Sequence, residues 1–95
     1  MIPSVEAITK VLEKLVTPKY PLIKNYHVEI QKEIEGHRVL VSVDVYFNVD
    51  DYWKTYHSGD YSFPNSLDDS IEYDIVNALK YLGLNYVYTH VYSLT

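Results

Sequence analysis

Two stretches of the chain place apolar side chains with the spacing of an amphipathic helix. Residues 4–16 and the stretch from Ser66 to Gly83 both carry apolar residues at i, i+3, i+4 and i+7 positions. Ser4 and Ser66 are suitable N-cap residues, and Gly83 suits the end of the second helix. The predicted buried faces comprise Val5, Ile8, Val11, Leu12, Leu15 and Val16 in the first helix and Leu67, Ile71, Ile75, Val76, Leu79 and Leu82 in the second.

Three other stretches alternate apolar and polar residues, which is the period of a β-strand. They span residues 23–34, 39–49 and 86–94, and in the middle stretch Val or Phe occupies every second position. Residues 35–37, Glu-Gly-His, form the predicted turn between the first two strands. Each strand is therefore expected to turn one aliphatic face towards the helices and to leave the other face at least partly in water.

The order of these elements is α-β-β-(loop)-α-β in a single domain, residues 1–95. This order predicts an α+β two-layer sandwich, in which a three-stranded sheet carries two helices on one face. A helix joins the second and third strands, so these strands should run parallel to each other. We expect the second strand to be central because it is the longest and most apolar. The predicted core contains Val41, Val43, Val45, Ile71, Ile75, Leu12 and Leu15.

Residues 50–65 match neither period and are predicted to form a long loop, with room for a helical turn at 51–57. Six of these residues are aromatic or histidine, namely Tyr52, Trp53, Tyr56, His57, Tyr61 and Phe63. Folding does not by itself require aromatic residues in a connection, and exposing them together would create an apolar patch. We therefore expect this loop to be ordered and to present Trp53 and Tyr56 to a partner.

Composition excludes several classes of protein. The chain has no cysteine, which rules out disulfides, thiolate metal sites and cysteine nucleophiles. No apolar stretch approaches the ~20 residues that cross a bilayer, and the start, Met-Ile-Pro-Ser, lacks the basic and apolar regions of a secretory signal. We expect a cytoplasmic protein without membrane association, found in the host cytoplasm or the virion if the chain is viral.

The sequence shows no catalytic or cofactor-binding pattern. It contains no phosphate loop, Rossmann fingerprint, Gly-x-Ser-x-Gly elbow or His-Glu-x-x-His motif. The four histidines, His27, His37, His57 and His90, lack metal-ligand spacing, although His27 and His90 could approach each other across strands. We therefore predict a non-enzymatic protein with no catalytic residue, no cofactor and no metal.

Tyrosine is the most unusual feature of the composition, because the chain has eleven beside one tryptophan and two phenylalanines. Tyrosine offers a large contact area with few rotors, and aromatic residues are enriched at the centres of interfaces. Small sheets also favour tyrosine at half-buried positions, which accounts for some of them. The candidate partner-binding residues are Tyr46, Trp53, Tyr56, Tyr86, Tyr88, His90 and Tyr92.

The middle of the chain is strongly acidic. The net charge is −5, and residues 44–74 contain eight carboxylates against Lys54 alone. Such a segment repels phosphate backbones, so general nucleic-acid binding is disfavoured. A solvated face that keeps the protein soluble is the simplest interpretation. The candidate acidic surface consists of Asp50, Asp51, Asp68, Asp69 and Glu72.

Three functions are compatible with these patterns. The first, which we favour, is a protein–protein interaction or assembly module, with a viral structural or accessory protein as one form of it. It predicts self-association through Tyr46, Tyr88 and Tyr92 or binding of another protein. The second is an acidic inhibitor that mimics nucleic acid, as a viral antagonist of a host nucleic-acid-binding system would.

The third is a small ligand- or RNA-binding domain that uses the tyrosine-rich sheet face. The element order resembles that of one class of KH domain, which binds single-stranded nucleic acid. The Gly-x-x-Gly loop with which such domains grip a nucleic-acid backbone is missing from this sequence. The resemblance is therefore one of topology and assigns no function.

Overall fold

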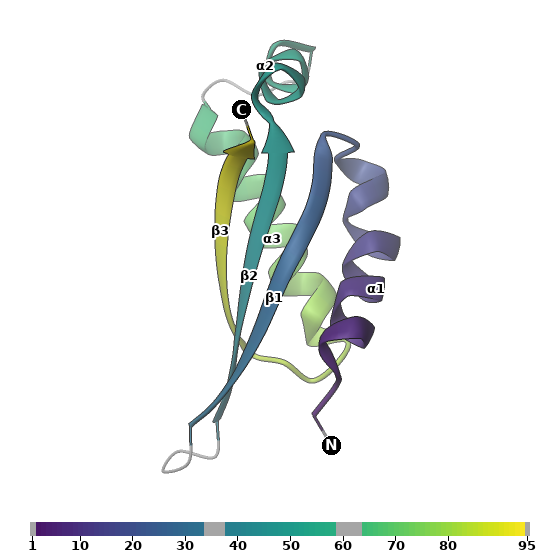
Figure 1. The fold of residues 1–95 in the computed structure, drawn as a ribbon, viewed down its shortest axis with the longest axis vertical. Helices are drawn as coiled ribbons and strands as arrows, with labels where there is room; N and C mark the ends of the chain where they lie inside the picture. The colour runs from purple at the N-terminus through teal and green to yellow at the C-terminus, as the bar shows by residue number, and fades with distance from the viewer. Residues whose placement is uncertain (1, 34–37, 59–63, 95) are drawn as a thin grey trace.

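Residues 2–33, 38–58 and 64–94 are described by a computed structural model of the chain (Figure 1). The elements are α1 (Val5–Leu15), the short 3-10 helix η1 (Thr17–Lys19), β1 (Ile23–Glu33), β2 (Arg38–Asn48), α2 (Val49–Ser58), α3 (Pro64–Lys80) and β3 (Tyr86–Leu94). The α+β class and the predicted order are confirmed, with α2 as an additional helix. The predicted turn at 35–37 lies outside the described residues.

The three strands form one mixed sheet in the order β1-β2-β3. β1 pairs antiparallel with β2, and β2 pairs parallel with β3, as the helical connection between them requires. The prediction of a central second strand is confirmed. In the middle of the sheet Val43 lies opposite Val28 on one side and Thr89 on the other.

The aliphatic positions of the strands face α1 and α3, which both lie on one side of the sheet (Figure 1). We call this the covered face. Val41, Val43 and Val45 of β2 are fully buried there, as alternation along the strand predicts. From α3, the residues Leu67, Ile71, Ile75 and Leu79 complete the core, and each of them is also fully buried.

α1 begins at its predicted cap, where Ser4 Oγ accepts a hydrogen bond from the Ala7 N–H at 3.1 Å. Ile8 and Leu12 are fully buried, but Leu15 is 42% exposed, so its assignment to the core is wrong. The apolar stripe of α1 is wider than the surface that covers it. The residues at its margins therefore stay in water, even though they fit the helical period.

α3 ends in a Schellman motif at Gly83, as predicted from the glycine. Gly83 has a φ of +76°, and its N–H donates to the Lys80 carbonyl at 2.9 Å. The Leu84 N–H donates to the Leu79 carbonyl at 3.2 Å, and both leucine side chains are buried. The helix starts at Pro64, ahead of the predicted cap Ser66, which agrees with the preference of proline for a first helical position.

The first part of the predicted 50–65 loop is a helix, α2, which follows β2 without a connection. Asn48 caps it, because the Asn48 side-chain oxygen accepts a hydrogen bond from the Asp50 N–H at 2.9 Å. Tyr52 is buried and stacks on Phe47 with ring centroids 4.6 Å apart. The expectation that folding requires no aromatic residue here is therefore wrong for Tyr52. Residues 59–63 lie outside the described part.

Candidate interaction surface

The face of the sheet opposite α1 and α3 is built by the polar and aromatic positions of the strands (Figure 1). We call it the open face, since neither of these helices covers it. Alternation along each strand sends these side chains away from the core. Across β1, β2 and β3 its rows are Gln31, Leu40 and Tyr86; Glu29, Ser42 and Tyr88; His27, Asp44 and His90; and Asn25, Tyr46 and Tyr92.

Exposure of the tyrosines on the open face depends on strand position. Tyr86 and Tyr88 of the edge strand β3 are 47% and 61% exposed, whereas Tyr46 of the central strand is half-buried between its neighbours. The Tyr92 side chain lies outside the described part of the structure, although its backbone continues the strand. Sequence alternation therefore predicted the face correctly, and the two edge tyrosines contribute most of its exposed aromatic surface.

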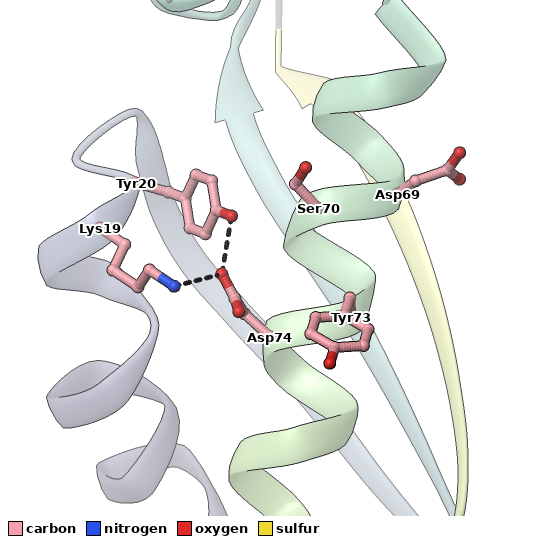
Figure 2. A pocket seen from close by; sticks show the side chains of 6 residues that line it. All are labelled: Lys19, Tyr20, Asp69, Ser70, Tyr73 and Asp74. Atoms are coloured by element: carbon pink, nitrogen blue, oxygen red, sulfur yellow. Dashed lines mark hydrogen bonds and ion pairs between the residues drawn. The ribbon is translucent and has the colours of Figure 1, made fainter. Parts of the chain in front are cut away.

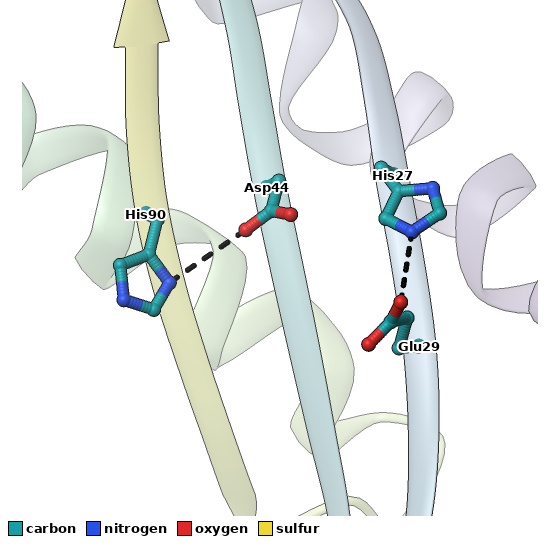
Figure 3. A network of polar contacts seen from close by, with 4 residues as sticks. All are labelled: His27, Glu29, Asp44 and His90. Atoms are coloured by element: carbon teal, nitrogen blue, oxygen red, sulfur yellow. Dashed lines mark hydrogen bonds and ion pairs between the residues drawn. The ribbon is translucent and has the colours of Figure 1, made fainter.

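Four titratable side chains occupy the middle of the open face (Figure 3). His90 Nδ1 lies 3.6 Å from Asp44 Oδ1, and His27 Nε2 lies 3.2 Å from Glu29 Oε1. They form two separate pairs, because His27 contacts its own strand and not Asp44 (Figure 3). Within the described ranges, no three histidine or carboxylate side chains are arranged to hold a metal ion. Exposed pairs of this kind contribute little to stability.

Trp53 and Tyr56 belong to α2, beyond the end of β2, and not to the rows of the open face (Figure 1). Trp53 is 43% exposed and contacts the buried Tyr52 edge to face, with ring centroids 5.4 Å apart. The Tyr56 side chain lies outside the described residues. The predicted partner-binding residues thus divide between the sheet and α2.

The five carboxylates of the candidate acidic surface differ in their surroundings. Asp50, Asp69 and Glu72 are exposed. Asp51 pairs with Lys24, whose Nζ lies 3.1 Å from Asp51 Oδ2. Asp68 is the fifth of these residues, and its carboxylate oxygen Oδ1 is buried without a hydrogen-bond partner. The surface therefore presents fewer free carboxylates than the sequence predicted.

The surroundings of Asp68 also change its acidity. Burial raises the pKa of Asp68 above its usual value, and the neighbouring Asp69 raises it further. A hydrogen bond with Tyr52 acts in the opposite direction, because it stabilises the ionised carboxylate. Asp68 thus links the first turns of α3 to the buried aromatic residue of α2.

A surface groove between η1 and α3 was not predicted from the sequence (Figure 2). At its centre Asp74 Oδ2 accepts a hydrogen bond from the Tyr20 hydroxyl at 2.7 Å and lies 3.0 Å from Lys19 Nζ. The Tyr20–Asp74 contact joins residues 54 positions apart, so no local pattern could reveal it. Lys19 balances the charge of Asp74 within the chain. These contacts therefore hold η1 against α3 and give the groove a structural role. Its lining consists of Lys19, Tyr20, Asp69, Ser70, Tyr73 and Asp74.

A second groove lies between α1 and β1 around Tyr26. The Tyr26 hydroxyl and Thr17 Oγ1 are 2.8 Å apart and share a hydrogen bond. Burial raises the pKa of Tyr26 above its usual value, although the bond with Thr17 lowers it, and the charge of Glu13 raises it again. This tyrosine therefore stays protonated at neutral pH and holds η1, which follows α1, to the sheet.

Comparison of the chain with protein-family models, with curated proteins and with solved structures gives no match. None of the helices in the described ranges combines the length and the apolar composition that a membrane span needs.

Proposed function

We propose that the chain is a non-enzymatic protein–protein interaction module that binds its partner through the open face. One observation carries this proposal: in the described part of the chain α1 and α3 cover one face of the sheet, and the other face exposes Tyr86 and Tyr88 at 47% and 61%. Tyrosine loses little conformational entropy on binding and supplies both apolar area and a hydroxyl. Such residues are common among those that contribute most to binding energy.

The charges of the open face favour a protein partner over a nucleic acid. Among its described side chains are two carboxylates, Glu29 and Asp44, and no lysine or arginine. Stacking of bases on tyrosine needs nearby cations to track the phosphate backbone. The carboxylates of the described rows repel a phosphate backbone, so the aromatic surface there suits the apolar and hydrogen-bonding groups of another protein.

The test compares two pairs of exposed tyrosines. Tyr86→Thr with Tyr88→Thr changes the open face and keeps a residue that favours strands. Tyr73→Thr with Tyr81→Thr is the matched control, because these tyrosines are 69% and 83% exposed at α3 and its end. Affinity capture from the native host, followed by mass spectrometry, should recover one set of partners with the wild type and the control. The amount of these partners that the open-face variant captures should be at least tenfold lower.

Salt separates this function from acidic mimicry of nucleic acid. An aromatic interface should persist when the ionic strength rises from about 0.1 M to 1 M, whereas carboxylates in a basic groove are screened over that range. Equal capture by both tyrosine variants, or capture that disappears in high salt, would overturn the proposed function. Thermal unfolding of each variant confirms that both still fold.

A further inference from the structure

β3 forms an unprotected edge of the sheet. It pairs with β2 over all nine of its residues without a register shift, and no strand lies beyond it within the described ranges. The outward backbone N–H and C=O groups of an edge strand are a template for further pairing. β3 contains no aspartate, glutamate, lysine, arginine, proline or glycine, so the residues that usually block such pairing are missing.

The opposite edge, β1, carries the protection that β3 lacks. Its register shifts between Ile23 and Asn25, a bulge that interrupts regular pairing. The bulged residue, Lys24, is engaged with Asp51 of α2. Glu29 adds a charge in the middle of the strand. Only one edge of this sheet is thus open to another strand.

The sequence of β3 is complementary to itself. In an antiparallel pair of two β3 strands centred on His90, like faces meet: on the open face His90 lies opposite His90 of the second copy, and Tyr88 lies opposite position 92 of that copy. On the covered face Val87 and Val91 are only partly buried beside the core, and a second copy would bury them further. Each β3 strand would therefore cover apolar side chains that the other strand leaves partly exposed.

The lack of acidic and strongly basic residues in β3 favours the approach of a second copy along this strand. Two copies with a net charge of −5 each repel one another. This electrostatic repulsion is smallest when they approach along a strip without charged side chains. β3 contains no acidic residue, lysine or arginine, and its one histidine is His90. Pairing of β3 with β1 of another copy would instead build an open-ended ribbon, which the bulge and the charges of β1 oppose.

We propose that β3 pairs antiparallel with β3 of a second copy of this chain, about a two-fold axis, to form one continuous six-stranded sheet. The interface uses the strand edge, so it does not depend on the proposed function of the open face. It also joins the two open faces into a single surface with the tyrosines of both copies at its centre.

The first test is the mass of the purified full chain, which sedimentation should show to be twice 11.1 kDa at concentrations of tens of micromolar. His90→Lys places two cations at the junction and should weaken the dimer at least tenfold. Ser42→Lys puts the same charge on the open face of the central strand β2, away from the edge, and should leave the dimer unchanged. A chain that stays monomeric up to about 100 µM would overturn the pairing.

The second test locates the contact without a disruptive charge. The chain has no cysteine, so His90→Cys and His27→Cys each accept a single spin label. These positions lie in the same row, on β3 and β1 respectively. With strands about 4.8 Å apart, labels at 90 should broaden each other's spectra, while labels at 27 would be about 24 Å apart across five strand spacings. A dimer with broadening at 27, or at neither position, would overturn the β3 contact.

Discussion

On the covered face Val41, Val43 and Val45 are fully buried under α1 and α3, whereas on the open face Tyr86 and Tyr88 remain about half exposed. Both faces arise from one alternation along the same strands, so local structure does not distinguish them. The difference lies in what covers each face. Residues of the covered face contribute to folding through burial, while Tyr86 and Tyr88 of the open face leave about half of their area in water.

α2 repeats this contrast within two adjacent residues. Tyr52 is buried against Phe47, and Trp53 beside it is 43% exposed. We expect Tyr52→Ala to lower the free energy of unfolding by about 3 kcal/mol or more, because it empties a packed aromatic site. Trp53→Ala should cost about 1 kcal/mol or less. Urea unfolding measures both, and equal losses would mean that the outer side of α2 belongs to the core.

The strand β2 offers the same comparison with smaller side chains. Val43→Ala should lower the free energy of unfolding by about 2–3 kcal/mol, because Val43 is fully buried at the centre of the sheet. Its neighbour Ser42 points to the open face, and Ser42→Ala should change stability by less than about 0.5 kcal/mol. A Val43→Ala protein that melts within a degree of the wild type would show that the strand faces the other way.

Periodicity was sufficient to predict most of the fold. The two long helices, the three strands, the parallel β2–β3 pair and the glycine at 83 all follow from local patterns. α2 could not be found in this way, because after Val49 its residues are polar or aromatic and form no aliphatic stripe. Its signal was the cap: Asn48 followed by two acidic residues in the first turn.

The candidate site was predictable only in part for a different reason. Alternation assigns Tyr46 and Tyr88 to one face, but only the strand order shows that Tyr88 lies at an edge and is the more exposed. The exposure of Leu15 likewise depends on what packs beside α1, which no helical period encodes. Long-range contacts such as that between Tyr20 and Asp74 leave no trace in local sequence.

Asp68 lies between the covered and exposed environments, and its titration reports on that position. Burial raises the pKa of Asp68, so the folded protein favours the neutral carboxyl. The stability that this group contributes is therefore full below its unfolded pKa of about 4. It is lost as the pH rises through the higher folded-state pKa. Above that pH the chain holds a carboxylate whose Oδ1 is buried without a partner.

Asp68→Asn removes this ionisation and keeps an oxygen that can accept the hydrogen bond from Tyr52. We expect the variant to be more stable than the wild type at pH 7 by less than about 1 kcal/mol, because partial exposure keeps the effect small. The helix dipole opposes this gain only weakly, since Asp68 lies past the first turn of α3, which starts at Pro64. Urea unfolding at a series of pH values above the unfolded pKa of about 4 should show the difference growing as the pH rises. Glu72→Gln removes a carboxylate that is exposed on the same helix and is the matched control. A difference that is constant with pH would place the cause in packing and not in the charge of Asp68.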